Sequence, residues 1–128
     1  MALPLRHARG WLAIGWALIA LAVLLSLVPG QNLPPTGLSD KTHHAAAYAL
    51  LALWFAGLYP RSRYLLIGLG LFTMGLAIEW AQGAMNLGRQ GDYRDVIANC
   101  VGVVSGLAAA FTPLGGWAQR LESWMRRT

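Results

Sequence analysis

The chain has 128 residues, of which 56% are hydrophobic and only 12% are charged, and six are tryptophan. Soluble domains have about a quarter of their residues charged, so this composition excludes an ordinary soluble domain and predicts an integral membrane protein. The net charge of +5 does not indicate nucleic-acid binding, because the cations flank apolar runs, where lipid headgroups are the nearest anions.

Four apolar runs follow one another along the chain, and each approaches the roughly 20 residues that a spanning helix needs. The first is longer than the apolar part of a signal peptide, and no A-x-A cleavage site follows it, so we interpret it as a retained span. Pro60 and Pro113 end the second and fourth runs. The predicted spans are about 11–28, 44–59, 64–84 and 96–112.

Residues 114–127 follow the last span and have a different pattern. Trp117, Leu121 and Trp124 are spaced i, i+4, i+7, and arginines lie beside them. This pattern is typical of a short amphipathic helix that lies on the inner leaflet, where anionic lipids attract its cations. A frayed basic tail is the alternative.

The distribution of lysine and arginine predicts the orientation in the membrane. With four spans, seven of the ten Lys and Arg residues fall on the side that holds both termini and the 60–63 turn. The other side holds only Lys41, Arg89 and Arg94. Short cytoplasmic segments carry the excess of such residues, so both termini are predicted to be cytoplasmic. The expected fold is therefore all-α, an integral membrane four-helix bundle that forms one domain over 1–128.

Polar side chains of the predicted spans gather in the outer third of the protein. Spans two, three and four each carry a pair of polar residues at i, i+3 or i, i+4 spacing, which places both on one helix face. An ionisable group that faces lipid costs about 3 kcal/mol, so we expect these pairs to face the bundle interior. The predicted site consists of Asp40, Lys41, His44, Tyr48, Glu79, Gln82, Arg89, Asp95 and Asn99.

Small residues recur at every fourth position of the fourth span. They are Ala98, Gly102, Gly106 and Ala110. Such stripes allow helix backbones to approach closely in membranes, so we interpret them as packing positions without a chemical role.

The polar residues follow the order D-K-x-x-H-x-x-x-Y, then E-x-x-Q, then R, then D-x-x-x-N-x-x-G-x-x-x-G, from about residue 40 to residue 106. In this order the sequence resembles the VanZ-like family of small bacterial membrane proteins. The resemblance implies a multi-pass protein of the bacterial cytoplasmic (inner) membrane. It also implies a link to the cell envelope and to antibiotic resistance, because the namesake of the family is linked to lowered sensitivity to the glycopeptide teicoplanin. It implies no settled biochemical activity.

Three interpretations of the polar site stay open. In the first, a lipid headgroup, with the phosphate or pyrophosphate of an envelope precursor, binds to Lys41, His44 and Arg89. In the second, the residues form a purely structural network that fixes helix register. In the third, the protein is a lipid-phosphate hydrolase or transferase, and its catalytic candidates are His44 as base or nucleophile and Glu79 as a buried acid.

Other ligands are not predicted. The single cysteine, Cys100, excludes a metal site built from several cysteines, and His44, Glu79 and Asp95 lack a recognised metal-ligand spacing. No cofactor is expected, the expected partners are membrane lipids, and the sequence does not indicate an oligomeric state. A channel or transporter is disfavoured, because the polar groups do not continue below the outer third.

Overall fold

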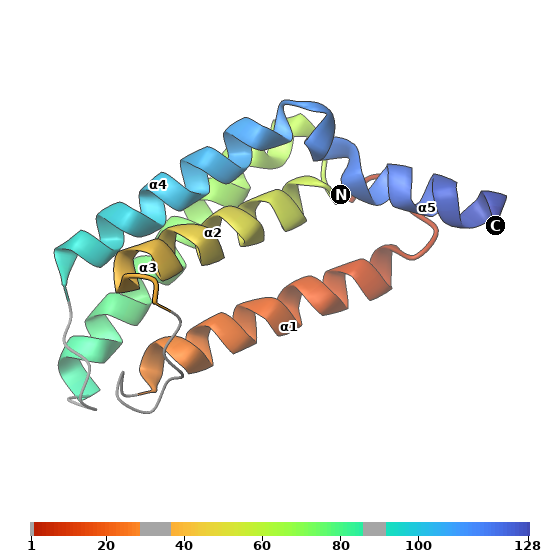
Figure 1. The fold of residues 1–128 in the computed structure, drawn as a ribbon. Coiled ribbons are helices and arrows are strands. Elements are labelled where there is room, and N and C mark those ends of the chain that lie inside the picture. Colours follow the sequence, from red (N-terminus) through yellow and green to blue (C-terminus); the bar gives the residue numbers. More distant parts are fainter. Residues whose placement is uncertain (1, 29–36, 86–91) are drawn as a thin grey trace.

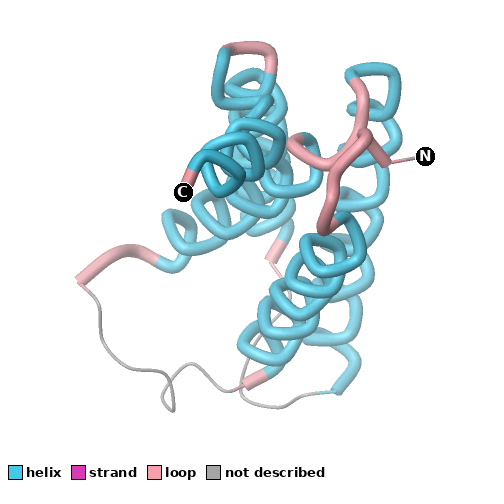
Figure 2. Tube along the Cα trace, turned by 90° about the vertical axis from the view of Figure 1, so that its right-hand side faces the viewer, coloured by secondary structure: helices cyan, strands magenta, loops and turns pink. Residues whose placement is uncertain are grey.

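The computed structural model describes residues 2–28, 37–85 and 92–128, and the regular structure in these ranges is entirely helical (Figures 1 and 2). The all-α prediction is therefore confirmed. In chain order the elements are α1 (Ala8–Leu27), α2 (Asp40–Ala56), the 3-10 turn η2 (Arg61–Arg63), α3 (Tyr64–Met85), α4 (Tyr93–Ala110), the 3-10 turn η3 (Pro113–Gly116) and α5 (Trp117–Arg127).

Two helical segments of the described chain are long and apolar enough to cross a membrane. They are α1 and the continuous segment Arg61–Met85, which joins η2 to α3. The segment Tyr93–Ala110 provides a third span only if it is counted together with Pro113–Arg127, from which it is bent by 80°. α2 has 17 residues and includes Asp40 and Lys41 in its first turn, so it is short for a span. These lengths support a membrane protein.

The most extensive contact between two helices of the described chain joins α2 to α4. A Cβ atom added at Gly102 would collide with the backbone of Ala45, and one added at Gly106 would collide with the carbonyl oxygen of Ala49. The same atom at Gly106 would also lie 2.8 Å from the Cβ of Ala52. The helix backbones therefore touch, as the stripe of small residues predicts.

The main core lies among α2, α3 and α4. Its buried members are Tyr48, Leu51, Ala52, Leu71 and Val103. α1 runs along the edge of this unit in Figure 1 and adds only partly buried side chains to the core. Gly15 is the one buried residue that α1 contributes, so α1 is the least embedded of the long helices.

Residues Trp117–Arg127 form the helix α5, which packs on the N-terminal segment. The indole of Trp117 lies 4.5 Å from that of Trp54 and 5.5 Å from that of Trp11, measured between ring centroids. The carboxylate of Glu122 accepts hydrogen bonds from the backbone N–H of Arg6 at 2.6 Å, the backbone N–H of His7 at 2.8 Å and the Trp11 Nε1–H at 2.8 Å. The carboxylate of Glu122 therefore joins the two ends of the chain.

The hydrogen bonds to Glu122 make stability depend on pH. Burial alone would raise the pKa of Glu122, but the donors from His7, Trp11 and Arg6 lower it below its ordinary value of 4.5. A carboxyl group whose pKa is lowered by folding stabilises the fold fully at pH values above its ordinary pKa. This stabilisation is lost as the pH falls through the lowered pKa.

Glu122→Gln is expected to lower the melting temperature at pH 7, because a neutral amide binds three N–H donors less strongly than a carboxylate does. Thermal unfolding in detergent between pH 7 and pH 3 measures this effect. Acidification is expected to narrow the difference between wild type and variant. A difference that stays constant over this range would contradict the assigned role.

Candidate functional site

The first turn of α2 contains Asp40 and Lys41, the first two residues of the predicted site. Ser39 caps this helix, since its side chain accepts a hydrogen bond from the Thr42 N–H, and Asp40 follows at the positive end of the helix dipole. The helix therefore begins four residues before the predicted start of the span. This early start places Lys41 and His44 on one continuous helix.

Lys41 joins α2 to the start of α4. Its ammonium lies 3.2 Å from the carboxylate of Asp92 and also forms an ion pair and hydrogen bond with Asp95. Asp92 caps α4 by accepting the Arg94 N–H at 2.9 Å. The Arg94 backbone N–H and the Lys41 ammonium lower the pKa of Asp92 below its ordinary value.

A buried pair lies beneath this ion pair. The Nδ1 atom of His44 lies 2.8 Å from the Oδ1 atom of Asn99, and both residues are less than a tenth exposed. Because the amide oxygen is an acceptor, Nδ1 carries a hydrogen and donates the hydrogen bond to Asn99. The other ring nitrogen, Nε2, lies 3.6 Å from Asp40 and 3.7 Å from Asp95. His44 is therefore oriented by Asn99 toward two carboxylates.

α3 contacts the same group of polar residues through Glu79 and Gly75. Glu79 accepts a hydrogen bond from the Asp92 backbone N–H. One turn along α3, a Cβ atom added at Gly75 would lie 2.9 Å from the Asn99 amide nitrogen and 3.4 Å from the Tyr48 hydroxyl. Glu79 thus faces the start of α4, and three helices contribute to one polar cluster. We use that name for Asp40, Lys41, His44, Glu79, Asp92, Asp95 and Asn99.

The remaining predicted site residues lie elsewhere or serve the core. Gln82 is buried, and its amide donates a hydrogen bond to the Ser26 carbonyl oxygen of α1 at 2.6 Å, so its contact is with α1. Tyr48 is 3% exposed and belongs to the hydrophobic core below His44. The predicted site residue Arg89 lies outside the described residues.

The accessible edge of the polar cluster carries both signs of charge. The side chains of Asp40, Lys41 and Asp92 are 52%, 40% and 36% exposed, whereas that of Asp95 is only 5% exposed. One ammonium and two carboxylates therefore face outward above a buried histidine and amide. The sequence interpretation stressed cationic donors, but within the described chain the acidic groups of the cluster outnumber Lys41.

The polar cluster also contains possible metal ligands and the two catalytic candidates. Asp40, His44 and Asp95 offer ligand atoms within 4.8 Å of one another, which makes them the trio of the described chain that could hold a metal ion. It differs from the set of His44, Glu79 and Asp95, for which the sequence showed no metal-ligand spacing, in that Asp40 takes the place of Glu79. Glu79 bonds to the backbone of Asp92, while His44 faces Asp40 and Asp95, so the two catalytic candidates have different partners.

Sequence reasoning missed Glu122, although a signal was available. It is the one acidic residue of the 128 that lies outside the polar cluster. A single acidic residue in a basic amphipathic tail therefore indicates that this residue has a specific bonding partner within the chain.

Comparison with family models, with curated proteins and with solved structures gives no match for this chain.

Proposed function

We propose that this protein binds, at the external face of the membrane, a lipid headgroup that carries both a phosphate and an amine. The observation that supports the proposal is the mixed-charge edge of the polar cluster, where the ammonium of Lys41 pairs with the exposed carboxylate of Asp92 and the carboxylate of Asp40 is also exposed. The ammonium of Lys41 is placed to pair with a phosphate, and Asp40 and Asp92 are placed to pair with an amine. Charge-assisted hydrogen bonds of this kind are roughly twice as strong as neutral ones.

The proposal includes four spans with both termini in the cytoplasm. With 17 residues, α2 is about 26 Å long, slightly less than the roughly 30 Å of a hydrocarbon core. A span of this length puts Asp40 and Lys41 at the depth of the external headgroups. The arginines near both termini and in η2 favour the cytoplasm for the opposite end.

The resemblance to the VanZ-like family extends this proposal to a biological setting. It favours the bacterial cytoplasmic membrane as the location and an envelope precursor as one source of the headgroup. Binding of such a precursor would connect the polar cluster with glycopeptide sensitivity. This connection rests on the family pattern, whereas the headgroup chemistry rests on the contacts of Lys41.

Native mass spectrometry of the purified protein in detergent tests headgroup binding. At the polar cluster, wild type is expected to bind phosphatidylethanolamine, which carries both charges, more tightly than phosphatidylglycerol, which lacks the amine. Binding to the polar cluster is measured as the lipid binding that is lost in Lys41→Gln. Lys41→Gln is expected to weaken phosphatidylethanolamine binding about tenfold, because it removes a charge-assisted bond to the phosphate.

Arg127→Gln is the matched control, since it removes one positive charge from the exposed end of α5. It should bind phosphatidylethanolamine as wild type does. Equal binding of this lipid by wild type and Lys41→Gln would refute the proposal.

A structural role is the second candidate, because Lys41 connects α2 to α4 through Asp92 and Asp95. If that connection were the whole function, Lys41→Gln would lower the melting temperature and leave the bound lipid unchanged. Measuring both quantities on the same variant therefore separates the two candidates.

A further inference from the structure

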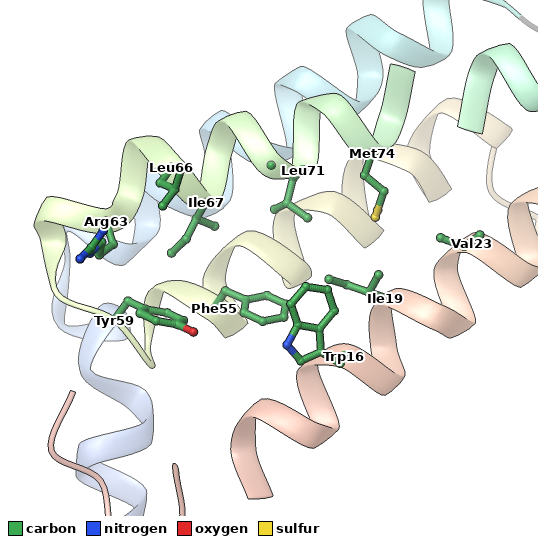
Figure 3. A pocket seen from close by; sticks show the side chains of 11 residues that line it. Trp16, Ile19, Val23, Phe55, Tyr59, Arg63, Leu66, Ile67, Leu71 and Met74 are labelled. Carbon is green, nitrogen blue, oxygen red and sulfur yellow. The ribbon is translucent and has the colours of Figure 1, made fainter. Parts of the chain in front are cut away.

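A groove of about 660 Å³ lies between α1 and α3, and Phe55 of α2 also lines it (Figure 3). Its walls are apolar and include Trp16 and Ile19 of α1 and Leu71 and Met74 of α3. Figure 3 shows Tyr59 and Arg63 at one end of the groove and Val23 and Met74 toward the other. The groove is therefore lined by apolar side chains and has a single cationic side chain, that of Arg63, at one end.

The length of the groove corresponds to one leaflet. Arg63 and Met74 are eleven positions apart on the continuous helix Arg61–Met85, which gives about 16 Å along its axis. This is about half of a hydrocarbon core of roughly 30 Å. Two turns beyond Met74, the hydrogen bond from Gln82 to the Ser26 carbonyl joins α3 to α1. That contact closes the space between the two helices at the end opposite Arg63.

The charge at the open end selects the occupant. Arg63 is exposed, and its guanidinium can pair with a phosphate through two parallel hydrogen bonds. We propose that the groove holds one acyl chain of an anionic phospholipid of the inner leaflet, with its phosphate at Arg63. A helix from a second copy would need the full membrane thickness, which the contact between Gln82 and Ser26 obstructs. This site lies apart from the polar cluster and does not rest on headgroup binding there.

Two glycines of α3 provide a matched test of the groove. A Cβ atom added at either Gly70 or Gly83 would meet no atom within 4 Å, so a leucine side chain at either position begins in open space. Gly70 lines the groove, whereas Gly83 lies beyond its closed end. Native mass spectrometry with phosphatidylglycerol is expected to show one retained lipid in wild type and in Gly83→Leu. Gly70→Leu is expected to retain at least fivefold less.

Unchanged lipid retention in Gly70→Leu would overturn the proposal. So would a wild-type dimer that Gly70→Leu converts to a monomer while lipid retention stays the same, because a second copy would then fill the groove. Lys41→Gln is expected to leave this lipid in place, which separates the groove from the external site.

Two arginines of the same turn test the phosphate contact. Arg63→Gln is expected to weaken phosphatidylglycerol binding about fivefold, the effect of one cation near a lipid surface, and to leave binding of uncharged diacylglycerol unchanged. Arg61→Gln is the control, because Arg61 instead donates to the Phe111 carbonyl at 3.3 Å and lies over the Phe111 ring. Equal effects of the two substitutions would overturn the assignment of the phosphate to Arg63.

Discussion

Gly106→Leu is expected to lower the free energy of unfolding by about 3 kcal/mol, the upper end of the usual cost of overpacking. The added side chain would collide with the carbonyl oxygen of Ala49 and crowd Ala52. The atoms in the way belong to the backbone and to a short side chain, so relief requires α2 and α4 to separate. Urea or thermal unfolding in detergent, with helix content followed by circular dichroism, measures the loss.

Gly83→Leu is the control for this experiment, since the same exchange there enters open space on α3. It should leave stability unchanged or raise it slightly, because leucine favours helix more than glycine does. If Gly106→Leu were as stable as Gly83→Leu, the close contact between α2 and α4 would be wrong.

Asn99→Ala is expected to cost about 1 to 3 kcal/mol of stability, because it leaves the buried Nδ1–H of His44 without its acceptor. His44→Ala should cost a comparable amount from the other side of the same bond. The double variant is expected to be less destabilised than the sum of the two single variants by about 1 kcal/mol. Denaturant unfolding of all four proteins measures this coupling, and strictly additive losses would show that the two side chains do not interact.

Much of the polar cluster can be predicted because lipid penalises exposed charge. Glu79, Asp95 and Asn99 lie at helix ends with partners at helical spacing, and a bundle interior is where such groups are stable. The stripe of Gly102 and Gly106 is readable for a related reason, since only small residues allow two membrane helices to touch. Both inferences use local spacing alone.

The partners of each polar residue are harder to predict, because they depend on neighbouring helices. Glu79 and Gln82 share a face by spacing, but residues three apart still differ by about 60° around the axis. That difference is enough for Glu79 to reach Asp92 on α4 while Gln82 reaches Ser26 on α1.

The roles of Lys41 and Glu122 depend on segments distant in sequence. Lys41 bonds to carboxylates more than fifty positions away. Helical spacing does not indicate how the start of α2 meets the start of α4. Glu122 bonds to backbone donors at the other end of the chain, 115 and 116 positions away. Spacing patterns describe single helices, whereas these contacts arise only when the helices assemble.

Headgroup binding at the polar cluster is tested most directly by photochemical cross-linking in membrane vesicles. The probe is phosphatidylethanolamine that carries a diazirine beside its amine, and the cross-linked peptides are mapped by mass spectrometry. The expected result is a concentration of adducts on residues 37–44 and 92–99, with fewer adducts in Lys41→Gln. Adducts spread evenly over the chain, or confined to η2 and α5, would contradict the proposed site.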